Sequence, residues 1–224
     1  MIQPLHLAID TSASLPAVAL MRGEQALSSW MGEGGLKHHE TLLGGVDHCL
    51  KKGGFPLKDL AFLSIGVGPG LFTGLRIGMV TAKFLADPLN LPCVAVPSLL
   101  ALALQSGEVG KGRVWALGDA KSRRVYALEV TELPPDFSSP PGEEVAISPE
   151  EAAQRMRSGD FLVGEGALLY KDLWPAGTRL LPESAHALKG ETVGKVGARR
   201  YALALTCTAT ELEPKYLKTG QAHL

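Results

Sequence analysis

Hydrophobic and polar positions follow two different periods in the first hundred residues. Short apolar runs at 5–9, 17–21 and 25–31 are separated by turn residues, a pattern typical of strands joined as an antiparallel meander. From residue 38 to about 52 the apolar spacing becomes three and four, which predicts a helix that Gly53-Gly54 ends. Apolar strands at 61–67 and 93–96 are each followed by a helical pattern, at 74–86 and 98–104, and Ser98 is the expected cap of the latter.

This order of elements predicts an α/β fold with a mixed sheet flanked by helices. It is the element order of a ribonuclease H-like lobe, the unit that the actin, Hsp70 and sugar-kinase ATPase superfamily uses twice. We therefore expect an N-terminal lobe over 1–104 and a smaller, degenerate second lobe over 105–192. A helix at about 193–205 is expected to pack back on the first lobe, and 206–224 to form a short polar C-terminal tail whose end frays.

Elements of the second half are predicted with less regular spacing. A Gly-rich linker at 107–112 leads to strands at 114–117 and 125–130, which form a hairpin around a polar turn. A Pro- and Ser-rich loop follows at 134–142, and Ser148-Pro149 before two glutamates is a helix start with a serine cap. A further strand is expected at 161–164.

Composition excludes several classes of protein. The chain has 224 residues, 46% of them hydrophobic, which suffices for a packed core, and a formal net charge of -1, without the basic excess of a nucleic-acid binder. We expect neither a signal peptide nor a membrane span, and hence a cytoplasmic protein. Cys49, Cys93 and Cys207 are widely spaced, which argues against a disulfide framework and a structural zinc site.

Two loops are candidates for phosphate contact. Asp10, Thr11 and Ser12 stand at a strand end, where a carboxylate and hydroxyls can position a metal-bound phosphate, although no glycine follows Asp10. The second loop follows a strand and opens a helix, the place where backbone N–H groups bind anions. It lacks both the lysine of a Walker loop and the spacing of a dinucleotide fingerprint. Its candidate contacts are Gly68, Gly70, Gly74 and Arg76, and the alternative role of the loop is a tight turn with close helix packing.

The sequence contains few candidates for catalytic groups. His38-His39-Glu40 lacks the second histidine of a zinc protease motif, since Leu43 stands in its place. No GxSxG nucleophile elbow exists. We therefore predict no catalytic residues, no metal and no cofactor. Asp10 and Asp119 are acidic groups that could meet across the two lobes.

The two N-terminal helices carry more apolar residues than one buried stripe needs. On the second of them these residues point nearly all round, so part of the surface must be covered by another element or another chain. The candidate partner-binding residues are Leu42, Leu43, Val46, Leu50, Leu75, Met79, Val80 and Leu85.

Several segments in chain order resemble the TsaB (YeaZ) family. They are LAIDTS, AVALMRG, KHHETLL, IGVGPGLFTGLRIG, DAKSRRVY and PKYLK, and they extend over essentially the whole chain. The long glycine loop is the most specific of them, and Leu71 is its one departure from the family pattern, which has a serine there.

The resemblance implies a non-catalytic subunit that binds TsaD through its N-terminal helices. TsaD transfers a threonylcarbamoyl group to N6 of the adenosine beside the tRNA anticodon, and the ATPase TsaE joins the pair. The same surface is expected to form a homodimer when the chain is alone, and tRNA is contacted only through the complex. Three alternatives remain: a small ATPase or phosphotransferase using Asp10 and the glycine loop, an inactive peptidase-like interaction protein, and an exported interaction factor.

Overall fold

The first of two sheets is built from the N-terminal half of the chain. The computed structural model describes residues 3–33, 38–133, 137 and 140–217. The strand order is β3-β2-β1-β4-β5, with β1, β2 and β3 antiparallel and β4 and β5 parallel to β1. The strands are β1 (Leu5–Asp10), β2 (Ala17–Arg22), β3 (Gln25–Met31), β4 (Phe62–Gly68) and β5 (Cys93–Pro97).

The second sheet repeats this topology. Its order is β8-β7-β6-β9-β10, with β6, β7 and β8 antiparallel and β9 and β10 parallel to β6. The strands are β6 (Val114–Asp119), β7 (Val125–Val130), β8 (Val145–Ile147), β9 (Phe161–Val163) and β10 (Arg179–Leu180). The prediction of two ribonuclease H-like lobes with mixed sheets is confirmed, although the short strands β8 and β10 were not expected.

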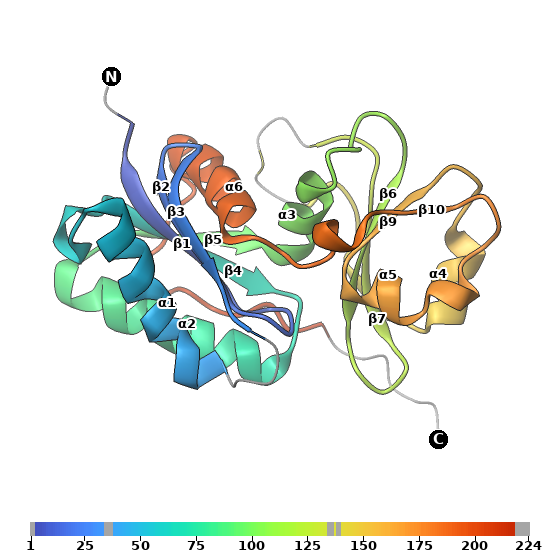
Figure 1. Cartoon of the computed structure of the whole chain (residues 1–224), viewed down its shortest axis with the longest axis horizontal. Helices are drawn as coiled ribbons and strands as arrows, with labels where there is room; N and C mark the ends of the chain where they lie inside the picture. Colours follow the sequence, from blue (N-terminus) through green and yellow to red (C-terminus); the bar gives the residue numbers. More distant parts are fainter. Residues whose placement is uncertain (1–2, 34–37, 134–136, 138–139, 218–224) are drawn as a thin grey trace.

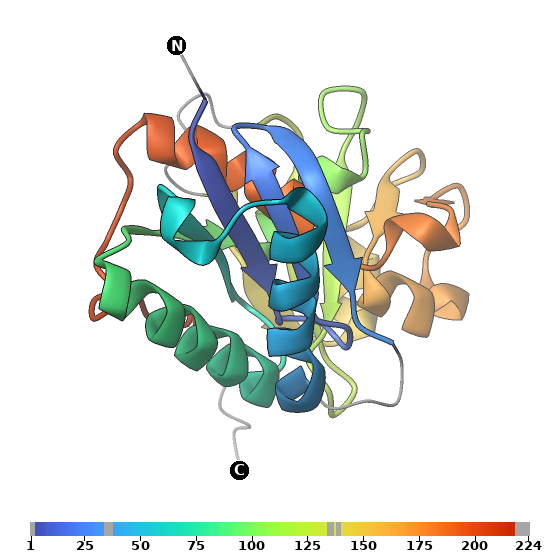
Figure 2. The same ribbon diagram turned by 60° about the vertical axis from the view of Figure 1, so that its left-hand side comes forward.

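Helices cover both outer faces and fill the space between the sheets (Figure 1). The helices α1 (His38–Gly53) and α2 (Phe72–Ala86) lie side by side on the outer face of the first sheet (Figure 2). Between the sheets lie α3 (Ser98–Gln105) and α6 (Gly190–Ala202), while α4 (Pro149–Arg155) and α5 (Glu165–Leu169) pack on the second sheet. Short 3₁₀ helices occur at Leu57–Asp59, Asp87–Leu89, Lys171–Leu173 and Glu183–Ala185.

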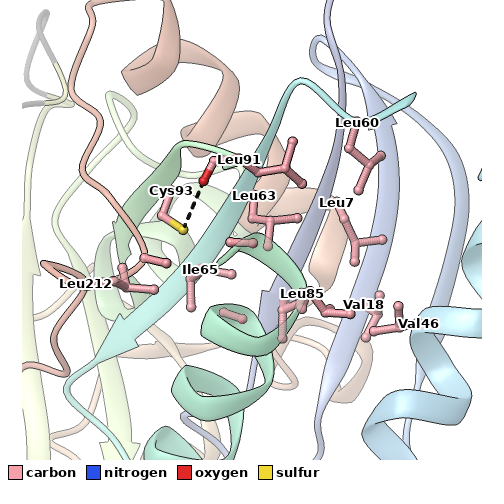
Figure 3. Close-up of a cluster of buried hydrophobic side chains, with 14 of the residues drawn as sticks. Leu7, Val18, Val46, Leu60, Leu63, Ile65, Leu85, Leu91, Cys93 and Leu212 are labelled. Atoms are coloured by element: carbon pink, nitrogen blue, oxygen red, sulfur yellow. Dashed lines mark hydrogen bonds between the residues drawn. The ribbon is translucent and has the colours of Figure 1, made fainter. Parts of the chain in front are cut away.

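Apolar side chains gather into three layers that match this arrangement. One lies between the first sheet and α1 and α2, and Figure 3 shows part of it, including Leu7, Leu63 and Leu85. A second surrounds α3 and α6 between the sheets, and a third lies under α4 and α5. Within the described part of the chain, no helix has both the length and the hydropathy needed to cross a bilayer.

Helix boundaries differ from the sequence-based expectation at a few places. Helix α2 begins at Phe72 because Leu71 already has the extended backbone of an N-cap, and α6 spans Gly190–Ala202, where 193–205 was expected. Ser98 does not cap α3, because Pro97 is the N-cap. Ser148 does cap α4, since its side chain accepts a hydrogen bond from the Glu151 amide.

Residues 207–215 of the C-terminal segment contact the first lobe. Cys207 pairs with Cys93 at the edge of β5, and the Lys215 amide donates to the Val67 carbonyl at 2.7 Å. Leu212 is only 1% exposed and belongs to the first core layer. Polar residues surround this one leucine in the sequence, so its anchoring role has no periodic signal. Residues 218–224 lie outside the described part.

A buried histidine contributes to the first sheet. His6 is fully buried and stacks on Phe62, with ring centroids 4.2 Å apart. Its Nε2 lies 3.0 Å from the Gly23 carbonyl, which can only accept, so Nε2 carries the proton and Nδ1 accepts from the Ser64 hydroxyl at 3.1 Å. Burial lowers the pKa of His6 to about 4, and the ring is neutral at pH 7.

Acid should destabilise the protein through His6. The pKa of about 4 in the folded state lies below the ordinary value of 6.5, so the unfolded state binds more protons between these limits. The stabilisation is complete above pH 6.5, declines as the pH falls towards 4, and amounts to about 3 kcal/mol. Urea unfolding of the wild type and of His6→Gln from pH 7 to 4.5 should show a steeper decline for the wild type. The same dependence of the unfolding free energy on pH in both proteins would contradict the lowered pKa of His6.

Candidate functional site

The turn after β1 is held by a buried carboxylate. Asp10 is 1% exposed, and its Oδ1 accepts from the Ser12 amide at 2.8 Å and the Ser12 hydroxyl at 2.7 Å. Its Oδ2 accepts from the Ser98 hydroxyl at 2.8 Å, and the same hydroxyl accepts from the Gly68 amide at 3.1 Å. Ser98, predicted as a helix cap, therefore links the carboxylate to the glycine loop.

Three glycines make room for the three residues of this turn. A Cβ atom on Gly66 would lie 1.8 Å from Asp10 Oδ2, and one on Gly70 would lie 2.3 Å from the Ser12 carbonyl oxygen. A Cβ on Gly78, in α2, would lie 2.1 Å from the Thr11 hydroxyl oxygen. These separations are far below van der Waals contact, so the glycines let the loop and helix close on the turn. This packing is a structural reason for the glycine motif.

A small cavity lies at the junction of the two lobes. Its volume is about 30 Å³, and its lining includes Ser12 and Gly70 from the first lobe with Asp119, Glu165 and His186 from the second part of the chain. Ligand pockets of nucleotide size are typically about 300–1,000 Å³. The cavity therefore has space for a couple of water molecules and not for a nucleotide.

Hydrogen bonds between Ser14 and Glu165 join the two lobes at this junction. The Glu165 carboxylate accepts from the Ser14 amide, with Oε1 at 3.0 Å, and also from the Ser14 hydroxyl. Glu165 stands at the start of α5, which follows β9 as α2 follows β4. The negative charge of this carboxylate beside the cavity opposes the binding of a phosphate there.

Asp10 and Asp119 occupy equivalent positions in the two repeats. Each ends the first strand of its sheet, and each Oδ1 accepts from the amide two residues later at 2.8 Å, from Ser12 and Lys121 respectively. Asp119 lines the cavity, and its Oδ2 accepts from the Lys121 ammonium at 2.6 Å, which raises the pKa of Lys121. In both repeats the carboxylate therefore anchors the turn that follows the first strand.

The seven candidate phosphate contacts divide into separate groups. Ser12 and Gly70 line the cavity, whereas Asp10, Thr11 and Gly68 lie buried behind it and Gly74 is buried in α2. Arg76 lies on the outer surface, with its guanidinium 3.9 Å from the Phe72 ring centre and its Nε donating to the Tyr216 hydroxyl at 3.2 Å. The structure therefore does not assemble these residues into one site.

The described residues contain no arrangement suited to metal binding or to nucleophilic catalysis. No group of three histidine, cysteine, aspartate or glutamate side chains there could hold a metal ion. The side chains of His38, His39 and Glu40 lie outside the described part. Burial raises the pKa of Cys49 to about 11, so its thiol is a weak nucleophile at neutral pH.

The predicted partner-binding residues divide between core and surface. Leu42, Val46, Leu75, Met79 and Leu85 are at most 8% exposed and belong to the core of this chain, so their side chains offer little surface to a partner. Most of them pack in the core layer between α1, α2 and the first sheet. Leu50 is half-buried. Leu43 and Val80 remain, with exposures of 53% and 67%.

An exposed stripe runs along the outer face of α2. It consists of Phe72, Arg76, Val80 and Phe84, each one helical turn from the next, and we refer to it as the outer stripe. Phe72 is 53% exposed and Phe84 is 70% exposed. Neither aromatic residue is among the partner contacts predicted from the sequence, although their spacing of four from Val80 and Arg76 was a usable signal.

The C-terminal segment extends the surface beside the outer stripe. A hollow of about 440 Å³ is lined by Val80, Phe84 and Pro88 together with Ala209 and Thr210 of that segment. The Lys83 ammonium donates to the Thr210 carbonyl at 3.3 Å, and the Tyr216 ring packs against Phe72 in a tilted arrangement with ring centroids 5.2 Å apart. Large exposed apolar side chains that gather in this way typically mark a protein–protein contact.

The chain has two ribonuclease H-like lobes, with carboxylate-anchored turns and a glycine loop near their junction. This architecture is that of the actin, Hsp70 and sugar-kinase ATPase fold superfamily. Residues 34–153 match the family model described as TsaD: tRNA N6-adenosine threonylcarbamoyltransferase. The chain is 30% identical to the tRNA threonylcarbamoyladenosine biosynthesis protein TsaB of Haemophilus influenzae, over 95% of this chain and 92% of that one. It therefore belongs to the TsaB family.

Other relatives agree over a similar span. The TsaB protein of Escherichia coli K12 is 29% identical, over 96% of this chain and 95% of the relative. The solved structure of YeaZ from Pseudomonas aeruginosa superimposes with a TM-score of 0.79 at 28% identity, covering 96% of this chain and all of that one. The recognition of a TsaB (YeaZ) protein from the sequence motifs is confirmed.

Proposed function

We propose that this chain is a non-catalytic subunit of tRNA threonylcarbamoyladenosine biosynthesis that binds and activates TsaD in the cytoplasm. The observation that carries the proposal is the outer stripe, where Val80 and Phe84 are 67% and 70% exposed on one face of α2. Family membership supports a role in this pathway, because the TsaB relatives are named as tRNA threonylcarbamoyladenosine biosynthesis proteins.

A catalytic role of its own is disfavoured by the junction between the lobes. The cavity there is about 30 Å³, and Glu165 of the second lobe is hydrogen-bonded to Ser14 of the first. A phosphotransferase would need space for a nucleotide and positive charge for its phosphates. The same argument disfavours the ATPase alternative, and the buried, weakly acidic Cys49 disfavours a cysteine peptidase.

The partner surface is assigned to the outer stripe, Leu43 and the hollow beside Phe84. In the proposed assembly TsaD covers this surface, TsaE joins the pair, and a homodimer uses the same face when TsaD is absent. A formal net charge of -1 favours tRNA contact through TsaD and not through this chain.

Modification of unmodified tRNA tests the proposal. TsaD, TsaE and the adenylate-forming enzyme are incubated with tRNA and ATP, with and without this chain, and the modified nucleoside is measured by mass spectrometry. We expect product only in its presence, and no ATP turnover by the chain alone. Equal product in its absence would remove the accessory-subunit proposal, and ATP turnover by the purified chain would favour the phosphotransferase alternative.

A further inference from the structure

Cys93 and Cys207 face each other between the edge of β5 and the C-terminal segment. The Cys93 amide donates to the Cys207 carbonyl, and the Cys207 amide donates to the Cys93 carbonyl, both at 2.8 Å. Reciprocal bonds of this kind define a directly opposed antiparallel pair, with both side chains on one face and Cα atoms about 5.5 Å apart. That separation lies within the range of about 4.4–6.8 Å seen in disulfides.

Each of the two sulfur atoms lies beside a backbone carbonyl of β5 or of the residues just before it. Cys207 Sγ lies 3.6 Å from the Cys93 carbonyl oxygen, and Cys93 Sγ lies 4.0 Å from the Leu91 carbonyl oxygen (Figure 3). Burial, and then the charge of a Cys207 thiolate, raise the pKa of Cys93 to about 11.

Cys207 is accessible to a small molecule. It is half-buried and lines an open hollow of about 440 Å³ together with small polar residues such as Asn90 and Thr208. Cys93 is fully buried behind it, and Cys49 is fully buried in α1. A reagent that enters the hollow therefore meets Cys207 before the other two thiols.

We propose that Cys93 and Cys207 form a modification site, a reversible intramolecular disulfide whose oxidant is a low-molecular-weight disulfide such as oxidised glutathione. The Cys207 thiolate attacks one sulfur of the small disulfide and releases one small thiolate, which leaves a mixed disulfide. Cys93 then loses its proton and attacks Cys207 Sγ, releasing the second small thiolate. Two protein thiols are oxidised, and one small disulfide is reduced to two small thiols.

The disulfide would attach the C-terminal segment to the sheet covalently. Directly opposed residues have Cβ atoms about 4.5–5.5 Å apart, whereas a disulfide prefers about 3.8 Å. The backbone at one of the two cysteines must therefore move towards the other when the disulfide forms. The segment around Cys207 belongs to no named strand and can make that shift. Its continuation supplies Ala209 and Thr210 to the hollow beside Phe84, so oxidation fixes one wall of the proposed partner surface.

Equilibration with glutathione tests this site. The full chain is incubated at pH 8 with a series of reduced-to-oxidised glutathione ratios, alkylated, and analysed by intact mass and peptide mapping. We expect loss of two alkylation sites, a cross-linked peptide pair containing Cys93 and Cys207, and a melting temperature higher by about 5 °C or more. The reaction should be faster at pH 9 than at pH 7, because burial raises the pKa of both thiols.

Two variants separate this disulfide from others. Cys49→Ala should retain the cross-link, and Cys207→Ala should lose it while keeping the circular dichroism spectrum of the wild type. Three results would overturn the proposal: no cross-link at any ratio, a cross-link that includes Cys49, or a stable glutathione adduct on Cys207 that Cys93 never resolves. None of these results depends on whether the chain binds TsaD.

Discussion

A Val80→Asp variant is expected to bind TsaD at least about 100-fold more weakly than the wild type, with its melting temperature unchanged within about 2 °C. Val80 is 67% exposed, so a carboxylate there stays hydrated in the free chain. In the proposed complex the same carboxylate would be buried without a partner charge, which costs several kcal/mol. Isothermal titration calorimetry with purified TsaD measures the affinity, and Phe84→Asp should behave in the same way.

Two further variants control for position. Met79→Asp changes the preceding residue of α2, which is 5% exposed and lies in the core, so this variant should unfold or aggregate. Leu169→Asp changes a residue that is 58% exposed on the outer side of the second lobe and should leave TsaD binding unchanged. Wild-type affinity in Val80→Asp and Phe84→Asp would show that the outer stripe is not the contact surface.

Replacing Gly66 by alanine is expected to cost at least about 3 kcal/mol of unfolding free energy. The new Cβ would lie 1.8 Å from Oδ2 of Asp10, and that carboxylate is held by Ser12 and Ser98. Either the buried hydrogen bonds break or β4 shifts, and both strain and unsatisfied buried charge destabilise a fold. Thermal and urea unfolding measure the change, with a fall in melting temperature of roughly 6–12 °C.

Gly44→Ala is the matched control for this substitution. Gly44 lies on the exposed side of α1, and no atom lies within 4 Å of the Cβ that alanine would add. Because alanine favours a helix over glycine, this variant should be more stable than the wild type by up to about 1 kcal/mol. An unfolding midpoint of Gly66→Ala in urea equal to that of the wild type would contradict the close packing of Gly66 against Asp10.

Strand and helix positions in the first lobe were predictable because each has a clean period. The short apolar runs of β1 and β2 and the helical spacing of α1 put element boundaries within one or two residues of those observed. The identity of the buried face on α2 was not predictable in this way. Apolar residues occur all round that helix, and only the position of the sheet separates Met79, which is buried, from Val80, which is exposed.

Other features depend on contacts between distant parts of the chain. Ser98 has the sequence signature of a cap, yet its hydroxyl donates to Asp10, eighty-eight residues earlier. Leu212 anchors the C-terminal segment from within a polar stretch. The closure of the junction by Ser14 and Glu165 likewise joins residues from different lobes, so no local pattern indicates it. The family motifs, by contrast, are local and were recognised from the sequence.

The position of α6 also affects when the first lobe can fold during synthesis. This helix comes from Gly190–Ala202, yet it packs against strands β1 to β5, and the segment after it pairs with Cys93. As the chain leaves the ribosome, one face of the first sheet, including Ala8, Met21 and Val94, is covered only in part, by α3, until the last part of the chain has been made. Cotranslational folding of the N-terminal lobe must therefore wait for the C-terminal residues, and a nascent chain of the first hundred residues presents an apolar surface to chaperones.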